Sequence, residues 1–367
     1  MTDIKILIIA GTRPNFIKIA PLYHRFKSES IFETKLCHTG QHFDRNMSAS
    51  FWECLELPDP DFDLKISAGN VPDTIGKTIV GVNDLLQENK FSLVIVVGDV
   101  NATVAGAIAA AQNGIPVMHV ESGLRSFDRA MPEELNRVIT DHISDLLMVS
   151  EPSGLTNLKN EGIPEDKVHF VGNIMIESLI RTRNRWGNLK LSEQLETAIK
   201  SPFATATFHR PENVDTRENL EKLLEIIQGI SENYKVIFPI HPRTRQRISQ
   251  FGLEEVLKNK NLVTIEPLGY FEFLKLISAS AFVITDSGGI QEETTYLNIP
   301  CITIRKNTER PVTITEGTNR LAGLYDQGLR KVVESHIHEV HKHRKISIAL
   351  WDDQVSERIS GVIKNHF

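Results

Sequence analysis

Short apolar runs that favour β-strands alternate with helical segments along almost the whole chain. The first half of the sequence predicts strands at residues 4–10, 34–38, 93–97, 116–120, 146–149 and 168–171. A second series follows, with predicted strands at 204–208, 235–240, 262–265, 281–284 and 300–304. Strands that alternate with helices of about 10–15 residues form βαβ units around a parallel sheet. The alternation therefore predicts an α/β fold with two Rossmann-like, doubly wound domains that face a central cleft.

The length of the chain agrees with two domains. A chain of 367 residues exceeds what one hydrophobic core usually supports. We therefore expect an N-terminal domain over residues 1–171 and a C-terminal domain over residues 172–350. Hydrophobic residues make up 41% and charged residues 24% of the sequence, which is ordinary for a globular protein.

Composition and patterning argue against several classes of protein. The net charge is −6 and no lysine- or arginine-rich face could neutralise a run of phosphates, so nucleic acid is not an expected partner. No stretch approaches the ~18 apolar residues of a membrane span, and the first strand begins without a signal-peptide pattern. The cysteines Cys37, Cys54 and Cys301 form no CxxC pair, which indicates a reducing compartment and argues against zinc. We expect a cytoplasmic protein that needs no metal and no nicotinamide cofactor, since the chain has no GxGxxG turn.

Polar residues follow nearly every predicted strand. Ligands of doubly wound sheets bind beyond the carboxyl ends of the strands, so these residues are candidates for a binding site. The first half offers Arg13, Gln41, His42, Asp99, Glu121 and Arg125, and the second offers His209, Arg210, His241, Arg243 and the turn 286–289. A cleft rich in arginine, histidine and carboxylate suits an anionic, hydroxylated ligand such as a nucleotide-sugar.

The segment 286–293, Asp-Ser-Gly-Gly-Ile-Gln-Glu-Glu, carries the most specific signal of this kind. It follows the apolar run 281–284 and opens a predicted helix. A helix start at Ser287, Gly288 and Gly289 would offer uncapped N–H groups and a positive dipole end, which together suit a phosphate. The carboxylates of Glu292 and Glu293 follow within the first turns, where one could bind a sugar hydroxyl.

Taken in order, the motifs resemble those of the non-hydrolysing UDP-N-acetylglucosamine 2-epimerase family. The residues that carry the resemblance are Gly11-Thr12-Arg13-Pro14 with Lys18, Gly40-Gln41-His42, Gly98-Asp99, Glu121-Ser122-Gly123-Leu124-Arg125, Pro132-Glu133-Glu134 with Asn136-Arg137, His209-Arg210-Pro211-Glu212-Asn213, Asp286 to Glu293, and Glu309-Arg310-Pro311. The resemblance implies the glycosyltransferase-B arrangement of two Rossmann-like domains, with a last helix near 351–367 packed back on the first.

The resemblance also implies a reaction. Family members invert C2 of the sugar of UDP-N-acetylglucosamine by anti-elimination of UDP and re-addition to a 2-acetamidoglucal, giving UDP-N-acetylmannosamine. The resemblance places the proton transfers on Asp99, Glu121 and Glu133 without deciding which is base and which is acid. It also places His209 beside the diphosphate. It further assigns substrate contacts to Arg13, Lys18, Gln41, His42, Arg137, His241, Phe273, Ser287, Gly288, Gly289, Glu292, Glu293 and Arg310.

Each of the main candidates also has a simpler structural explanation. Asp99 could cap the helix that begins near residue 101, and Glu121 could pair with Arg125 in its own loop. Glu133 and Arg137 have the i, i+4 spacing of a surface helix pair. His209 could bond to a carbonyl group, and Arg310 could be an ordinary solvated arginine.

The sequence departs from the family pattern in places that bear on the substrate. Asn15 and Val100 stand where the family usually has Glu and Thr, and the segments that hold an activating second substrate molecule in many bacterial members differ here. Arg243 or Arg245 could meet a sugar carboxylate, so a 2-epimerase of UDP-2,3-diacetamido-glucuronic acid is the alternative. A hydrolysing relative that releases N-acetylmannosamine and a glycosyltransferase also remain open. The family leads us to expect a homodimer.

Overall fold

The structure is a computed structural model that describes residues 4–40, 52, 54–67, 69–326, 329–342 and 346–367. The chain divides into two compact units, Met1–Thr182 with Ala349–Phe367, and Arg183–Ile348. The sequence-based boundary at residue 171 precedes this division by one helix, α7 (Ile174–Arg181), which packs against α1 and α17 of the first unit. No helix among the described residues is both long and apolar enough to span a membrane.

The first unit is built around a seven-stranded parallel sheet with the strand order β3-β2-β1-β4-β5-β6-β7. Its strands are β1 (Ile4–Ala10), β2 (Phe32–His38), β3 (Phe62–Asp63), β4 (Leu93–Val97), β5 (Val117–Ser122), β6 (Leu146–Val149) and β7 (Val168–Phe170). Its helices are α1 (Arg13–Lys27), α3 (Val71–Glu88), α4 (Asn101–Gln112), α5 (Pro132–Ile143), α6 (Pro152–Asn160), α7 and α17 (Val355–His366).

Burial explains the apolar sequence of the central strands of this sheet. Every residue of β4 is fully buried, because helices cover both faces of the sheet.

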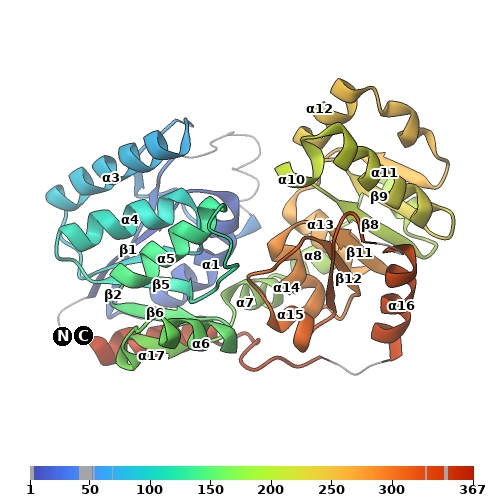
Figure 1. The fold of residues 1–367 in the computed structure, drawn as a ribbon. Coiled ribbons are helices and arrows are strands. Elements are labelled where there is room, and N and C mark those ends of the chain that lie inside the picture. Colours follow the sequence, from blue (N-terminus) through green and yellow to red (C-terminus); the bar gives the residue numbers. More distant parts are fainter. Residues whose placement is uncertain (1–3, 41–51, 53, 68, 327–328, 343–345) are drawn as a thin grey trace. The chain divides into compact units, whose positions relative to one another are not determined.

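The segment that follows the second unit in sequence returns to this core. In Figure 1 α17, at the red end of the chain, lies beside the blue and green elements of the first unit. There Ser356 donates to Glu177 of α7 through its backbone N, at 2.6 Å, and Ser360 donates to Glu29, at 2.8 Å.

The second unit contains a six-stranded parallel sheet with the order β10-β9-β8-β11-β12-β13. Its strands are β8 (Phe203–Thr207), β9 (Lys235–Pro239), β10 (Leu262–Ile265), β11 (Phe282–Thr285), β12 (Cys301–Ile304) and β13 (Asn319–Ala322). Its helices are α8 (Arg183–Asn188), α9 (Glu193–Ala198), α10 (Pro211–Val214), α11 (Arg217–Ser231), α12 (Pro242–Phe251), α13 (Tyr270–Ser278), α14 (Gly288–Tyr296), α15 (Val312–Thr315) and α16 (Leu329–Lys342).

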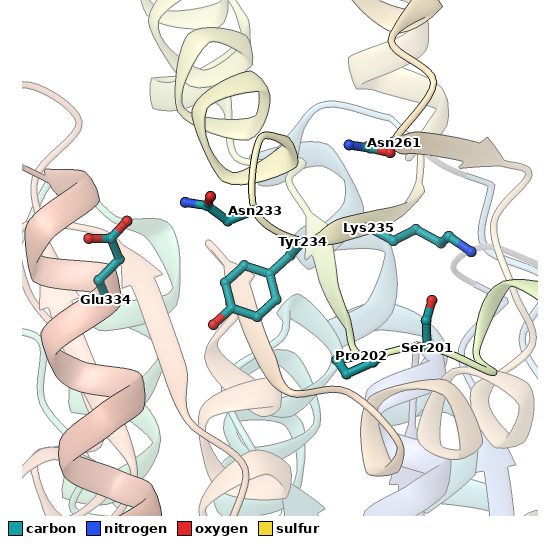
Figure 2. A pocket seen from close by; sticks show the side chains of 7 residues that line it. All are labelled: Ser201, Pro202, Asn233, Tyr234, Lys235, Asn261 and Glu334. Carbon is teal, nitrogen blue, oxygen red and sulfur yellow. The ribbon is translucent and has the colours of Figure 1, made fainter.

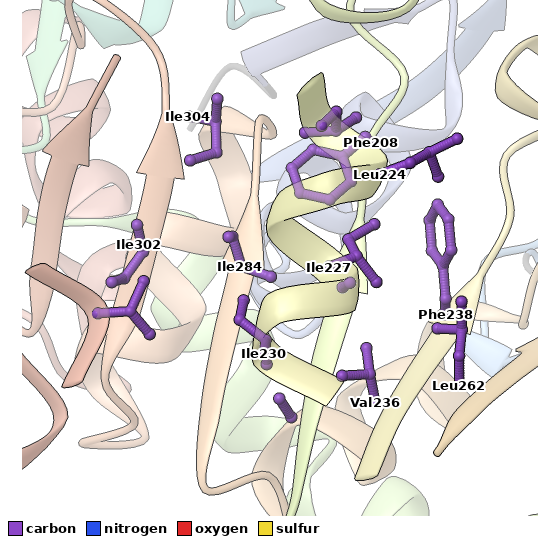
Figure 3. Packing of buried hydrophobic residues seen from close by; sticks show 14 of the residues in the cluster. Phe208, Leu224, Ile227, Ile230, Val236, Phe238, Leu262, Ile284, Ile302 and Ile304 are labelled. Atoms are coloured by element: carbon purple, nitrogen blue, oxygen red, sulfur yellow. The ribbon is translucent and has the colours of Figure 1, made fainter. Parts of the chain in front are cut away.

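The core of the second unit forms where α11 packs on its sheet. Apolar residues of α11 recur with helical spacing at Leu220, Leu223, Leu224, Ile227 and Ile230, and all of them are buried. Figure 3 shows the side chains of this helix directed at the strands, among the residues of β9, β11 and β12.

Both sheets reverse their strand order at one point. In the first unit β1 pairs with both β2 and β4, and in the second β8 pairs with both β9 and β11. The loops at the carboxyl ends of these strand pairs diverge to opposite sides and leave a crevice where ligands of this fold class bind. The fold therefore directs attention to the residues after β1, β4, β8 and β11.

Candidate active site

The candidate residues of the first unit lie after β1 and β4, the strands of its switch point, and at the end of the neighbouring β5. Arg13 and Lys18 belong to α1, Glu121 belongs to the last part of β5, and Asp99 follows β4. Gln41 and His42 lie outside the described residues.

Glu121 and Lys18 form a buried ion pair over the turn that ends β4. Their side chains are 5% and 8% exposed, and the carboxylate Oε2 contacts Lys18 Nζ. A Cβ atom at Gly98 would lie 2.8 Å from the same Nζ, and the φ angle of Gly98 is +67°, so this turn requires glycine. Glu121 itself has a φ of +72°, which costs a non-glycine residue about 1–2 kcal/mol and persists only where its surroundings enforce it.

Asp99 belongs to a second charged group, which joins the end of β4 to α5. Its carboxylate is bound by Nη1 of Arg137, a fully buried side chain, whereas Asp99 remains 25% exposed. Nη2 of Arg137 donates to Glu134 Oε2 at 2.8 Å, and Glu134 also accepts from the backbone N of Ser126 and of Phe127, each at 2.9 Å. Burial alone would raise the pKa of Glu134, but these donors outweigh it and hold that pKa below its ordinary value.

These contacts replace the simpler explanations of Asp99 and Glu121. The residue that caps α4 is Val100, which forms no side-chain capping bond, so Asp99 does not serve as the cap. Glu121 pairs with Lys18 and not with Arg125, which pairs instead with acidic residues of α5 and of the end of α6.

The helix α5 presents Glu134 inward and Glu133 outward. Glu133, one of the three carboxylates predicted to act in proton transfer, is exposed, whereas Glu134 is buried and forms the i, i+3 ion pair with Arg137. The i, i+4 pair suggested by the sequence is therefore not the main contact of Arg137. Glu134 was named only as part of the motif after Pro132, and no role was predicted for it from the sequence.

Asn15 accounts for one departure from the family pattern. Its Oδ1 accepts from the backbone N of Gly11 at 3.1 Å and of Thr12 at 3.2 Å, and its Nδ2 donates to the carbonyl oxygen of Val97 at 3.0 Å. This buried amide joins the turn after β1 to the end of β4, which a carboxylate could not do because it has no donor.

In the second unit, Asp286 organises the loop after β8. Its buried carboxylate accepts from the backbone N of His209 at 3.1 Å and of Arg210 at 2.9 Å, and from Nδ2 of Asn213 at 3.1 Å. It also contacts His209 Nδ1 at 3.0 Å. Burial would raise the pKa of Asp286, but hydrogen bonds and the charge of His209 hold it below its ordinary value.

His209 consequently directs its other ring nitrogen, Nε2, away from Asp286. The side chain is 41% exposed, and its ring lies 5.4 Å from that of His241. Burial and the neighbouring His209 lower the pKa of His241. The contact of His209 is thus with a carboxylate and not with a carbonyl group, the simpler explanation of the sequence.

The start of α14 gathers charged side chains around a glycine. Ser287 precedes the helix and forms no side-chain cap, which leaves the first N–H groups of α14 free of that bond. A Cβ atom at Gly288 would lie 2.8 Å from Glu309 Oε1, 3.1 Å from Arg310 Nη1 and 3.8 Å from Arg305 Nη1. A larger residue there would have to displace these charged side chains.

Arg305 is a component of this group that was not predicted from the sequence. The guanidinium is 1% exposed, and its Nη2 donates to Glu309 Oε2 at 2.9 Å. Its Nη1 is buried and has no hydrogen-bond partner among the described residues. Burial lowers the pKa of Arg305. A basic residue directly after β12, in the same position relative to the strand as Asp286 after β11, was the available signal.

Behind this turn, two adjacent carboxylates have different surroundings. Glu292 pairs with Nε of the buried Arg310 at 3.0 Å, so Arg310 is not a solvated residue. Burial raises the pKa of Glu293 to about 8, with Tyr270 opposing the shift and Glu292 adding to it. The pKa of Tyr270 is raised well above its ordinary value by the same burial and by Glu293. Phe273 lies one turn further along α13 and is half-buried.

The arginines considered for a sugar carboxylate already have acidic partners. Nε of Arg243 donates to Asp215 at 2.9 Å, and Arg247 binds the same carboxylate at 3.1 Å. Arg245 pairs with Glu266 at 2.8 Å.

A hollow of about 690 Å³ in the second unit lies elsewhere. Figure 2 shows Asn233, Tyr234 and Lys235 along it, at the amino end of β9, with Glu334 of α16 on the other side. The candidate residues follow the carboxyl ends of the strands, so this hollow is not part of the candidate site. Within the described residues, no group of three histidine, cysteine or acidic side chains could hold a metal ion.

Comparison with known proteins places the chain. A sequence model of the family described as UDP-N-acetylglucosamine 2-epimerase matches residues 24–364. The chain is 43% identical over 370 residues to the UDP-N-acetylglucosamine 2-epimerase of Methanococcus maripaludis, with 98% of this chain and 96% of that protein covered. This chain belongs to the UDP-N-acetylglucosamine 2-epimerase family.

Two further family relatives bear on fold and substrate. The crystal structure of the Methanocaldococcus jannaschii UDP-GlcNAc 2-epimerase in complex with UDP-GlcNAc and UDP has a TM-score of 0.89 and 38% identity, and covers 99% of this chain and 100% of that one. The UDP-2,3-diacetamido-2,3-dideoxy-D-glucuronate 2-epimerase of Pseudomonas aeruginosa is 38% identical over 322 residues, 87% of this chain and 88% of that protein. The family and the glycosyltransferase-B-like fold expected from the sequence are thereby confirmed.

Proposed function

We propose that this protein interconverts UDP-N-acetylglucosamine and UDP-N-acetylmannosamine by inverting C2 of the sugar. The observation that carries the proposal is the presence, in one chain of this family, of an anion site at one switch point and a carboxylate group at the other. The relatives described above act on, or bind, UDP-sugars of this type.

The second unit supplies the groups that we assign to UDP. The first N–H groups of α14, at Gly288 and Gly289, suit the diphosphate because a helix start attracts anions. Ser287 can contribute its hydroxyl group, since its backbone N already donates to Oγ1 of Thr285 at 3.0 Å. His209 directs Nε2 outward and can offset negative charge on the leaving phosphate. The pKa of Glu293 is about 8, so its carboxyl group is protonated at lower pH and can form a hydrogen bond to a ribose hydroxyl.

The first unit supplies the groups that we assign to the sugar. Removal of the C2 proton by a carboxylate, with cleavage of the C1–O bond to the diphosphate, gives a 2-acetamidoglucal and UDP. Re-addition of UDP at C1, with a proton delivered to the other face of C2, gives the epimer, so atoms balance without an oxidant. Asp99 and Glu121, each held by a buried cation, are our candidates, together with the exposed Glu133.

The P. aeruginosa relative supports a second candidate, epimerisation of UDP-2,3-diacetamido-glucuronic acid. That sugar carries a carboxylate that needs a cation. Arg243 and Arg245 are paired with Asp215 and Glu266, so either would have to exchange its present partner for the substrate. We therefore place this substrate second.

An experiment in D2O separates the candidates. Incubation with UDP-N-acetylglucosamine alone should give deuterium at C2 and UDP-N-acetylmannosamine in the NMR spectrum. Free N-acetylmannosamine with UDP would instead indicate a hydrolysing enzyme, and absence of both deuterium and product would refute the proposal. A parallel incubation with UDP-2,3-diacetamido-glucuronic acid tests the alternative: faster turnover of that substrate would reverse our order.

We also propose that the protein works as a cytoplasmic homodimer. The support is family resemblance together with the cysteines Cys37, Cys54 and Cys301, which are free, as a reducing compartment would keep them. Light scattering on the purified protein measures its mass in solution, and a value near that of one chain, 41.4 kDa, would contradict the dimer.

A further inference from the structure

A fully buried histidine lies behind the turn that carries Asp99. His119 is in the interior of β5 and is 0% exposed. Its Nε2 lies 2.8 Å from the carbonyl oxygen of Gly98, and its Nδ1 lies 2.6 Å from Oδ1 of Asp141 on α5. A carbonyl oxygen can only accept, so His119 Nε2 carries a hydrogen and donates it to Gly98.

Asp141 extends the contact to the second carboxylate turn. Its other oxygen, Oδ2, accepts from the backbone N of Gly123 at 3.0 Å and lies 2.7 Å from Nη1 of Arg125. Burial alone would raise the pKa of Asp141, but His119 and Arg125 outweigh it, so the pKa is below its ordinary value and the group is an anion. Asp141 thus contacts His119 through one oxygen, and Gly123 and Arg125 through the other.

The two turns that this network joins both have unusual backbone. Gly98 has a φ of +67° and Gly123 a φ of +80°. Glu121, near the end of β5, has a φ of +72°. A strained conformation persists when the surrounding contacts over-determine it, and such positions concentrate at functional sites. Burying His119, Asp141 and Arg125 together also carries a desolvation cost that apolar residues would avoid.

We propose that His119 and Asp141 are positioning residues that fix the spacing of the Asp99 and Glu121 carboxylates. His119 holds the carbonyl group of Gly98, directly before Asp99, and Asp141 holds the N–H group of Gly123, two residues after Glu121. One hydrogen-bonded pair thus sets both turns. The inference rests on the proposed function, because it assigns the proton transfers at C2 to these carboxylates.

The chain offers a matched control in Glu161. This carboxylate binds the same Arg125, through Nε and Nη2, each at 2.7 Å. It is 25% exposed and belongs to neither turn. Asp141→Asn and Glu161→Gln therefore each replace one negatively charged partner of Arg125 by a neutral amide. Only Asp141→Asn also changes the contacts of Gly123 and His119.

The test measures deuterium incorporation at C2 of UDP-N-acetylglucosamine by NMR, with UDP affinity by calorimetry and thermal unfolding for each variant. We expect Asp141→Asn to lower kcat by ~10- to 100-fold, the cost of misplacing catalytic groups. Its KM and UDP affinity should stay within ~3-fold of the wild type, because UDP is assigned to the second unit. Glu161→Gln should keep kcat within ~3-fold.

Variants of His119 keep the proposal testable if Asp141→Asn folds poorly. His119→Phe retains a ring but no donor, and His119→Gln retains an amide donor for Gly98, so kcat should fall further in the first than in the second. Wild-type kcat in Asp141→Asn or His119→Phe, or equal losses in Asp141→Asn and Glu161→Gln, would overturn the inference. Failure of the wild type to exchange C2 would instead refute the proposed function itself.

Discussion

Glu121 shows how one residue can be recognised in the sequence while its surroundings are not. Its place after an apolar run and before Ser-Gly-Leu-Arg marked it as a candidate, but the sequence favoured Arg125 as its simplest partner. The structure pairs it with Lys18, about a hundred positions away, because parallel strands bring β1 and β5 to the same edge. Such a pairing depends on strand order, which residue spacing does not reveal.

Replacing Glu121 by Gln should abolish most turnover and leave UDP binding in place. The amide cannot take a proton from C2, so we expect kcat to fall by at least ~100-fold. UDP affinity should change by less than ~3-fold, since its contacts are assigned to the second unit. NMR and calorimetry give the two quantities.

The control for this substitution is Glu33→Gln. Glu33 also pairs with a lysine, Lys5, at 3.1 Å, but both side chains are about half exposed at the surface. It should behave as the wild type. Full activity in Glu121→Gln would remove this carboxylate from the proposed site.

Glu293 predicts a pH dependence of stability. Its pKa is about 8 in the folded protein, against an ordinary value of 4.5, so the folded state binds one proton more than the unfolded state between these limits. Stability must then fall as pH rises from about 4.5 to about 8, and the loss is complete above the folded pKa. Glu293→Gln removes this proton and its pH dependence.

Thermal unfolding at pH 5 and pH 8.5 tests this prediction. The Glu293→Gln variant should gain stability relative to the wild type on going to the higher pH, by a few kcal/mol at most, at ~1.4 kcal/mol per unit of pKa difference. Glu316→Gln, an exposed carboxyl group of the same unit, is the control and should show no such trend. If the difference in stability between Glu293→Gln and the wild type stayed constant with pH, Glu293 could not be neutral in the folded protein.

At the scale of elements, the strands were predictable where burial made them apolar. Every residue of β4 is buried under helices on both faces, and its apolar run identified it. The strands β3 and β13 were not predicted from the sequence. β3 has only two residues, and β13 is Asn319–Ala322, which contains Arg320 and lacks an apolar run.

Helix faces were harder to predict than strand ends. The sequence named the Glu-Glu pair at the start of α5, but the choice between Glu133 and Glu134 depends on how the helix is rotated against the sheet. His119 and Asp141 gave no signal, because a polar residue in a strand interior or at helix position 141 has many ordinary explanations. Only the contacts between β5, α5 and the turn at Gly98 distinguish them.

The start of α14 predicts a role for Arg305 in binding the diphosphate. Its buried Nη1, without a partner in the described part of the chain, lies near Gly288. A charge-assisted hydrogen bond to phosphate contributes about 1.5–3 kcal/mol, so Arg305→Met should weaken UDP binding by ~10- to 100-fold. Arg305→Lys, which keeps the charge, should lose less.

Uridine serves as the control ligand for Arg305, because it lacks the diphosphate. Calorimetry should show uridine affinity unchanged in Arg305→Met. Equal weakening of UDP and uridine would mean that Arg305 maintains the shape of the unit through Glu309 and does not contact phosphate.

At the scale of the whole molecule, the last segment of the chain completes the first unit. Val355, Ile359 and Ile363 of α17 are fully buried, although the whole second unit separates them in sequence from the helices they join. Arg358 adds a bond from Nε to the carbonyl oxygen of Val171 at 2.7 Å. The complete core of the first unit therefore includes side chains that follow the whole second unit in the sequence.

This connection predicts where a mutation in α17 acts. Ile359→Ala should destabilise the first unit by about 2–5 kcal/mol, the usual cost of truncating a buried isoleucine. Hydrogen exchange followed by mass spectrometry should show faster exchange in α1, α7 and the strands of the first sheet, with β8 to β12 unchanged. Asn365→Ala, on the exposed side of the same helix, should alter neither unit. If hydrogen exchange became faster to the same extent in both sheets, the two units would unfold together. That result would contradict a role of α17 confined to the first unit, because the second sheet has its own core.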